Sequence, residues 1–85
     1  MATYRILYWQ EVPSQIRAED EQGDVNVALP PKFMARIDAL AAARRLEGSD
    51  DYLAQWRWSE DQEREGSATD VADAVRRELE QQADW

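Results

Sequence analysis

Two pairs of adjacent carboxylates, Asp50-Asp51 and Glu60-Asp61, are the first places in this sequence to look for chemistry. Paired acids could act as general acid and general base, or they could hold Mg²⁺ or Ca²⁺. Acid–base catalysis, however, needs two carboxylates in different environments that converge on one substrate. A calcium loop of the EF-hand kind needs regularly spaced oxygen ligands, and the sequence lacks that spacing. We therefore interpret both pairs as solvated surface acids.

The sequence contains no cysteine and no histidine. The hydroxyl groups therefore have no imidazole to activate them, which excludes the Ser-His and Cys-His arrangements of covalent catalysis. The single lysine, Lys32, is expected at an exposed position in the first turn of a helix. Three scattered glycines cannot form a phosphate-binding loop. We expect a protein that is not an enzyme and that holds neither a metal ion nor a cofactor.

Large aromatic side chains suggest a different kind of function. Four tryptophans occur among the 85 residues, and two of them lie in a Trp-Arg-Trp sequence. Tryptophan and tyrosine are enriched at the centres of protein interfaces. The candidate partner-binding residues are therefore Trp9, Tyr52, Trp56, Arg57 and Trp58. The alternative places the rings in the core of a small domain, and we favour it for Trp9 and Trp56.

Three segments that would position these side chains have the composition of β-strands. Residues 3–10 and 15–20 are expected to pair antiparallel, with residues 11–14 as the connection because Pro13 interrupts a ladder. Residues 25–29 show apolar alternation, which predicts a short strand or an extended segment. Residues 60–66 are polar and are expected to form a loop.

Two segments predict longer helices. Residues 31–45 begin with proline in the first turn, carry one apolar stripe and are followed by Gly48, which fits a helix stop. Residues 67–82 begin at Ser67 with a sequence that resembles a capping box, and they form an acidic C-terminal helix.

The segment that contains the Trp-Arg-Trp sequence is ambiguous. A helix over residues 49–56 would begin with Ser49 as its cap, followed by two acids. Residues 55–59 fit either a helix, which stacks Tyr52 on Trp56, or a strand, which puts both tryptophans on one face. We favour a short helix that passes into extended chain.

Together these elements predict a single domain, residues 1–85, of the α+β class. A small antiparallel sheet of two to four strands is expected to pack against two or three helices. At this length only about 60–65% of the unfolded surface is buried, so the core is small. The predicted core residues are Ile6, Tyr8, Ile16, Phe33, Ile37, Leu40, Leu53, Trp56, Val71, Val75 and Leu79. Trp85 is expected either to be disordered or to be docked on something.

The chain is acidic, with 18 acids against 10 bases and a formal net charge of −8 at pH 7. Such a chain is repelled by nucleic-acid phosphates and by anionic membranes. The sequence has neither the pattern of a signal peptide nor an apolar stretch of membrane-spanning length. We therefore expect a cytoplasmic protein with a protein partner, and neither nucleic acid nor membrane as a partner.

Residues 24–58 permit one alternative. Their order of strand, helix, glycine and capped helix is similar to a ribbon-helix-helix module, which dimerises through its strand and reads DNA with outward side chains. Here those side chains would be Asp24, Asn26 and Ala28, and none of them is basic. DNA binding is therefore disfavoured. The strand could still pair with a second copy by edge addition, which would give a homodimer.

Several short motifs point to a known family. The unusual hexapeptide Trp-Gln-Glu-Val-Pro-Ser lies within residues 3–16, and Asp50-Asp51-Tyr52-Leu53, Trp56 and Gly66-Ser67-Ala68 follow it. With these motifs the chain resembles the small bacterial virulence factor family over nearly its whole length. The resemblance implies a stand-alone short member that acts as an accessory domain, with no catalytic residue to carry over. Some relatives look associated with folate- and corrinoid-dependent methyl transfer, which implies one class of partner.

The sequence thus predicts a non-catalytic protein-interaction domain, or an accessory subunit of a bacterial cytoplasmic complex. One alternative is an accessory protein of folate- and corrinoid-dependent methyl transfer. Another is a ribbon-helix-helix-like DNA binder. A small enzyme would need a pocket in which Asp50, Asp51 or Glu60 meets Arg57 or a second carboxylate.

Overall fold

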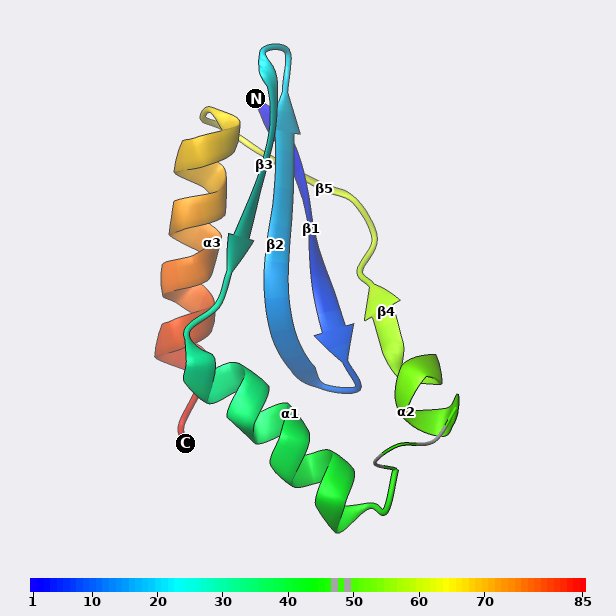
Figure 1. Cartoon of the computed structure of the whole chain (residues 1–85). Helices are drawn as coiled ribbons and strands as arrows, with labels where there is room; N and C mark the ends of the chain where they lie inside the picture. The colour runs from blue at the N-terminus through cyan, green and yellow to red at the C-terminus, as the bar shows by residue number, and fades with distance from the viewer. Residues whose placement is uncertain (47, 49) are drawn as a thin grey trace.

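The computed structural model describes residues 1–46, 48 and 50–85, and it shows an antiparallel sheet with helices packed around it (Figure 1). The strands are β1 (Ala2–Trp9), β2 (Val12–Asp20), β3 (Gly23–Ala28), β4 (Trp56–Trp58) and β5 (Gln62–Arg64). The helices within the described residues are α1 (Pro31–Ala43), α2 (Asp50–Ala54) and α3 (Ala68–Gln82). The strand order is β3-β2-β1-β4, and β5 pairs with the beginning of β1. This confirms the α+β class.

The long β1–β2 hairpin contains an irregularity that matters for the core. Ile6 lies opposite Ile16, but the register shifts by one residue after Leu7, so that Trp9 lies opposite Val12. Because side chains alternate between the two faces of a strand, Ile6 and Trp9 face opposite sides of the sheet. Because of the shift, the Val12 side chain points to the same face of the sheet as that of Trp9. The hairpin therefore carries buried apolar side chains on both of its faces.

The connection that the sequence predicted between the first two strands is wrong in its extent. Strand β2 begins at Val12 and includes Pro13, at the point where the register shifts. The turn is confined to Gln10 and Glu11, and Gln10 adopts the left-handed conformation with φ of 52°. Proline is tolerated here because an irregular ladder does not need a hydrogen bond from its nitrogen.

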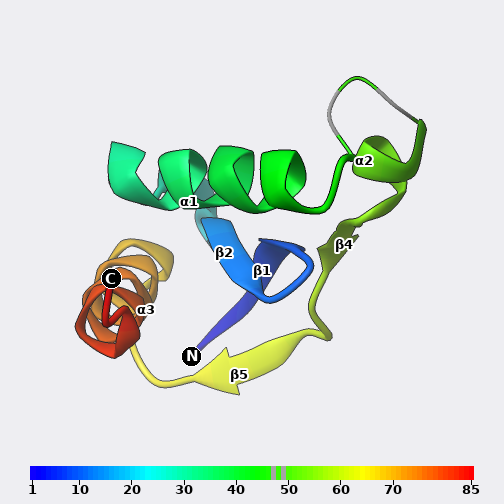
Figure 2. The same ribbon diagram turned by 90° about the horizontal axis from the view of Figure 1, so that it is seen from below.

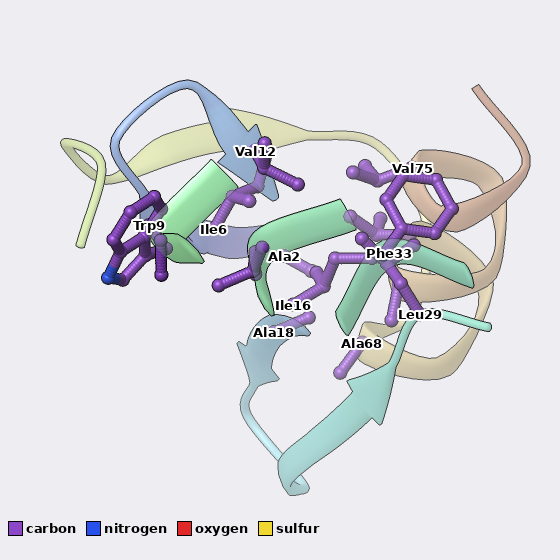
Figure 3. Packing of buried hydrophobic residues seen from close by; sticks show 14 residues of the cluster. Ala2, Ile6, Trp9, Val12, Ile16, Ala18, Leu29, Phe33, Ala68 and Val75 are labelled. Atoms are coloured by element: carbon purple, nitrogen blue, oxygen red, sulfur yellow. The ribbon is translucent and has the colours of Figure 1, made fainter. Parts of the chain in front are cut away.

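The helices cover different parts of the sheet. Helix α3 packs on β1, β2 and β3 with a small apolar stripe. Helix α1 crosses the ends of the strands, and Figure 2 shows α1 and α3 on two sides of the β1–β2 hairpin. The buried residues form one cluster, which Figure 3 shows as sticks. Its members are Ala2, Ile6, Trp9, Val12, Ile16, Ala18, Leu29, Phe33, Ile37, Ala41, Ala68, Val71, Ala72 and Val75.

Most of the predicted core is confirmed. Six of its residues, Ile6, Ile16, Phe33, Ile37, Val71 and Val75, are buried. Four more, Tyr8, Leu40, Trp56 and Leu79, are partly buried and pack against the cluster. The prediction of a buried position is wrong for Leu53, which is 65% exposed. Helix α2 buries none of its residues, and its contact with the cluster is made by Tyr52.

Helix α1 ends earlier than predicted. Its last residue is Ala43, and Arg45 takes the left-handed conformation with φ of 57°. The Leu46 N–H donates to the Ala41 carbonyl over 2.8 Å, and the Arg45 N–H donates to the Ala42 carbonyl over 3.2 Å. These two hydrogen bonds together form the Schellman motif, which usually has glycine at the left-handed position. Gly48 is therefore not the stop that the sequence predicted.

The region after α1 gives two further outcomes. The predicted cap Ser49 lies outside the described residues. Residues 50–58 form a short helix followed by strand β4, as we favoured. The prediction of a loop over residues 60–66 is wrong for Gln62–Arg64, which form β5 and pair with Ala2–Tyr4. No apolar alternation marks β5. Its pairing is supported by a hydrogen bond of 3.0 Å from the Tyr4 hydroxyl to Gln62.

The residues that resemble a ribbon-helix-helix module form a different arrangement. Strand β3 is paired with β2 from Gly23 to Ala28, and α2 has only five residues. The ribbon is thus part of the chain's own sheet. Strand β3 still lies at one end of the strand order. Its pairing with a second copy stays a prediction.

A carboxylate joins the sheet to α3. The Ser67 hydroxyl accepts a hydrogen bond from the Asp70 N–H over 3.2 Å, which confirms the predicted cap. Asp20, the last residue of β2, accepts a bond of 2.7 Å from the N–H of Ala68 and another of 2.8 Å from the N–H of Gln22. These donors, above all Ala68, lower the pKa of Asp20. The N–H groups in the first turn of α3 have no partner within the helix, and here Asp20 of β2 and the cap Ser67 accept their hydrogen bonds.

We predict that Asp20→Asn destabilises the protein at neutral pH but not in acid. A carboxyl with a lowered folded-state pKa contributes stability above the unfolded value of about 3.9 and loses it as the pH falls through the folded-state pKa. Urea unfolding at a series of pH values measures the difference from the wild type. Glu21→Gln removes a neighbouring exposed acid and is the matched control. A difference that does not decrease as the pH is lowered toward the acid unfolding of the wild type would contradict this role for Asp20.

We predict that Ile37→Asp unfolds the domain. Ile37 is fully buried on α1, and a buried unpaired carboxylate costs several kilocalories per mole, comparable to the whole stability of a small domain. Ala39→Asp introduces the same group at an exposed position of the same helix and serves as control. Thermal unfolding followed by circular dichroism distinguishes the two variants. Cooperative unfolding of Ile37→Asp at an unchanged midpoint would refute the placement of α1.

Candidate partner-binding surface

Three of the candidate aromatic residues form a cluster inside the domain. Trp9 and Trp56 lie opposite each other in β1 and β4. The Tyr52 ring contacts both, with its centroid 5.5 Å from that of Trp9 and 6.3 Å from that of Trp56. The Trp9 indole N–H donates to the Tyr52 carbonyl over 2.9 Å. These contacts attach α2 and β4 to the end of β1.

The interior location removes Trp9 from the candidate surface. Its side chain is 0% exposed, so it cannot reach a partner in this conformation. Tyr52 and Trp56 are partly buried and pack against the core. The favoured alternative of a core role is therefore confirmed for Trp9. For Trp56 the favoured core role is confirmed in part, because the residue is half-buried and its ring contacts that of Tyr52.

Arg57 and Trp58 lie on opposite faces of the sheet, because consecutive residues of a strand alternate. Arg57 lies opposite Tyr8, with its guanidinium carbon 5.2 Å from the centroid of that ring. Its Nη2 also donates to the Gln10 carbonyl over 3.3 Å. Trp58 lies opposite Leu7 and is 41% exposed. Trp58 is therefore the candidate tryptophan that the structure presents to solvent.

We call the residues Arg5, Leu7 and Trp58 the Trp58 surface. The three side chains point to the same face, since Leu7 pairs with Trp58 and Arg5 is two residues from Leu7 on β1. The Arg5 guanidinium carbon lies 4.9 Å from the Trp58 ring centroid, which is a cation–π contact. Arg5 also lies 4.0 Å from the carboxylate of Asp61.

The strand that carries Trp58 is fixed at its end by a residue of the same segment. The Ser59 N–H donates to the Ile6 carbonyl over 2.8 Å, and the Ser59 hydroxyl accepts from the Ile6 N–H over 2.9 Å. The hydroxyl thus extends the ladder by one bond where the strand itself ends. The Trp58 backbone is therefore held by the pairing of β4 with β1 and by the two Ser59 hydrogen bonds that follow it.

The residues that an enzyme would need are not brought together. Asp50, Asp51 and Glu60 are all exposed, and no ion pair connects any of them to Arg57 in the part of the chain that the structure describes. Within the same residues, no group of three or more acids could hold a metal ion. The carboxylate pairs of the sequence are thus surface acids in the structure.

Apart from Asp20, whose pKa is lowered by backbone N–H groups, the groups with shifted pKa values lie in exposed ion pairs. Hydrogen bonds from Arg44, Arg76 and Arg64 lower the pKa of Glu11, Asp73 and Glu78, respectively. Hydrogen bonds to Glu78 and Asp73 likewise raise the pKa of Arg64 and Arg76. Each shift favours the charged form, whereas a general acid at neutral pH needs a carboxyl whose pKa is raised.

The comparison with protein families identifies the chain. The family described as Virulence factor matches residues 7–84. The chain belongs to the virulence factor family. Neither the curated proteins nor the solved structures contain a match. The matched segment of this family member includes the aromatic cluster and Leu7 and Trp58 of the Trp58 surface. In the described part of the chain, no helix has the length and apolar character needed to cross a lipid bilayer.

One aromatic contact could not be inferred from the sequence. Trp85 docks on Phe33 with an edge-to-face geometry and a centroid distance of 4.8 Å. Of the two expectations for Trp85, the docked one is therefore confirmed. No sequence pattern connects these two residues, since they are brought together only by the crossing of α1 near the end of α3.

We predict that Trp9→Phe and Trp58→Phe differ in their effect on stability. The first variant removes the indole hydrogen bond to the Tyr52 carbonyl, which keeps its bond from the Gln55 N–H, and it leaves space in a fully buried site. The two effects together should cost about 1–3 kcal/mol. The second variant alters an exposed ring and should change stability by less than about 0.5 kcal/mol. Urea midpoints at equal m-value measure both effects. Equal losses in the two variants would show that Trp58 is a core residue too.

Proposed function

We propose that this virulence factor family member is a non-catalytic protein-interaction domain that binds its partner through the Trp58 surface. The observation that carries the proposal is the exposed Trp58 ring, held on a sheet strand beside Leu7 and under Arg5. Tryptophan and arginine are the residue types most enriched among those that dominate binding energy. The surface therefore offers an apolar anchor together with a planar cation.

The rigidity of the site supports the proposal. Association costs free energy when side chains and loops must be ordered. Trp58 is in a strand whose end is fixed by Ser59, and its ring is covered on one side by Arg5. Little freedom remains to be lost when a partner covers the ring. A rigid ring on a sheet is thus better suited to binding than an exposed tryptophan in a loop.

The charge around the surface indicates the partner. Glu60 and Asp61 lie two and three residues after Trp58 and are exposed, and the chain as a whole has a net charge of −8. Electrostatic complementarity then favours a neutral or basic protein surface and disfavours nucleic acid. The absence of cysteine suits a reducing compartment. We accordingly propose an accessory subunit of a bacterial cytoplasmic complex.

The distribution of ionisable groups also supports a non-catalytic role. Within the described residues, the core contains no charged or polar residue, and the shifted carboxyl pKa values are all lowered. No described contact favours the accessory role in folate- and corrinoid-dependent methyl transfer over another partner. The proposal is therefore limited to protein binding.

We predict that a specific partner is retained by the wild-type chain and lost with Trp58→Ala. The test is affinity capture from the native cells with quantitative mass spectrometry, followed by a binding titration with the purified partner. Met34→Ala is the matched control, because Met34 is 40% exposed but lies on α1. Loss of an anchor of this kind costs about 2 kcal/mol or more, a decrease in affinity of about 30-fold.

Two results would contradict the proposal. One is a purified partner that binds Trp58→Ala and the wild type equally well. The other is turnover of a small substrate by the pure protein that is abolished by replacing a single carboxylate, such as Asp51→Asn. Both measurements require only that the variants keep the circular dichroism spectrum of the wild type.

A further inference from the structure

The two edges of the sheet differ in how they are protected against pairing. On one side of β1 lie two separate strands of three residues each, β4 and β5, so that edge is short and interrupted. On the other side β3 runs over six residues, and its register with β2 contains no shift. Natural sheets protect their edges with charged side chains, proline, bulges or short strands. Strand β3 has no proline, and its single charged residue, Asp24, is paired with Arg17 of β2.

Helix α3 leaves the edge of β3 accessible. The helix contacts β1 and β2 as well as β3, so it lies on a face of the sheet and not along its edge. Val25 and Val27 are half-buried and pack against the core, whereas Asp24, Asn26 and Ala28 are exposed. One face of β3 is therefore covered, and its other face and its outer edge are open to a partner.

The backbone of β3 alternates between groups that bond to β2 and groups that point away from it. The Leu29 N–H donates to the Ser14 carbonyl over 3.0 Å. Because hydrogen-bonded residue pairs alternate along an antiparallel ladder, the register makes Val27 and Val25 the residues of β3 that bond to β2. Within the described residues, no other element or side chain bonds to the backbone groups that point outward. These outward N–H and C=O groups belong to Asp24, Asn26 and Ala28.

A second copy of β3 satisfies all of the outward groups in one register. If Asn26 lies opposite Asn26 of the second copy, Asp24 lies opposite Ala28 at both ends of the ladder. Each opposed pair exchanges two hydrogen bonds, so the three outward N–H groups and three outward C=O groups of each copy are all used. A register centred on Asp24 would put two like charges opposite each other, which is destabilising. The strand is thus complementary to itself about a two-fold axis at Asn26.

The side chains fit the same register. Val25 lies opposite Val27 of the second copy, and the four valines form one apolar strip on the face that α3 covers. Cross-strand pairs of β-branched residues stabilise a sheet. On the other face the two Asn26 side chains meet, and each amide can donate to and accept from the other.

Charge complementarity supports a second copy as the occupant. In the register centred on Asn26, Gly23 of one copy lies opposite Leu29 of the other, so the exposed Glu21 in the preceding turn approaches the beginning of α1. Lys32 is exposed there, and among the described residues it forms no ion pair. The positive end of the helix dipole lies at the same place. An acid thus meets a cation twice in the symmetric pair, although the chain as a whole is acidic.

We propose that β3 is the dimerisation edge of this protein and pairs antiparallel with β3 of a second copy about a two-fold axis at Asn26. One sheet then continues through both copies. A ladder of six residues is a small contact compared with a standard interface of about 1,600 Å², so the dimer should dissociate in the micromolar range or above. The proposal concerns a different strand from the one that carries Trp58 and does not depend on the function proposed for the Trp58 surface.

A single introduced thiol tests the register, because the sequence contains no cysteine. Asn26→Cys should oxidise to a covalent dimer, since the opposed Cα atoms of a bonded pair lie about 5.5 Å apart, within the range of a disulfide. Asp24→Cys is the matched control on the same strand and face. Its two thiols would lie about 14 Å apart along the strands and should cross-link at least about tenfold more slowly. Non-reducing electrophoresis over a time course of oxidation measures both rates.

A proline at the axis tests the hydrogen bonds. Because the Asn26 N–H points outward, Asn26→Pro keeps the ladder with β2 and removes the two central bonds of the dimer. Asn26→Thr retains the N–H and is its control. Sedimentation equilibrium up to about 1 mM protein should show dimers of the wild type and of Asn26→Thr, with a dissociation constant at least about tenfold higher for Asn26→Pro.

Two further comparisons separate the contacts. Lys32→Glu should weaken the dimer by several-fold, because it places an acid against Glu21, whereas Arg45→Glu makes the same charge change at the other end of α1 and should have little effect. Trp58→Ala should leave dimerisation unchanged. Failure of the Trp58 surface and failure of the β3 edge are therefore distinguishable.

Three outcomes would overturn the inference. The first is a wild type that remains monomeric up to about 1 mM, which would leave the β3 edge to a strand of a different protein. The second is equal cross-linking of Asn26→Cys and Asp24→Cys. The third is an unchanged dissociation constant in a folded Asn26→Pro. Should Asn26→Pro not fold, as judged by circular dichroism, the two cysteine variants decide, because neither removes a backbone donor.

Discussion

The fold depends on the burial of one indole. Trp9 is at the end of β1, where its N–H is bonded to a carbonyl of α2 and its ring packs on Tyr52. A chain of this length has few apolar side chains with which to fill a core, and an indole buries on the order of 200 Å². Its burial also attaches β4 to the sheet, because Trp56 is its neighbour across the strands. The strand that presents Trp58 therefore exists because Trp9 is inside.

The tryptophans divide into an inner and an outer set. Trp9 and Trp56 hold the sheet, α2 and β4 together, while Trp58 and Trp85 remain accessible at two separate places. Each accessible ring has a cation against it, Arg5 on Trp58 and Arg36 on Trp85. A stacked guanidinium covers part of an apolar ring in the free protein and keeps it from unspecific association. The same arrangement leaves the rest of the ring for a partner.

More of the fold than of the candidate binding surface could be predicted from the sequence. Periodicity identified the buried face of α3 and most of α1, because the residues that repeat at helical spacing must be inside. It could not place Leu53, since in a helix as short as α2 the choice between Tyr52 and Leu53 depends on where the sheet lies. Nor could it identify β5, which has no apolar pattern and is formed by pairing with β1. The contact of Trp85 with Phe33 depends on tertiary crossing and has no local signal.

Strand β3 closes one side of the sheet in the strand order, while β4 and β5 share the other neighbour position of β1. In an antiparallel pair of identical edges, the two-fold axis is perpendicular to the sheet, so equivalent faces point the same way. Two chains joined along β3 would thus display both Trp58 rings toward one side, at opposite flanks of a continuous platform. Such a platform would favour a partner with repeated epitopes, for which avidity can compensate for a modest single contact.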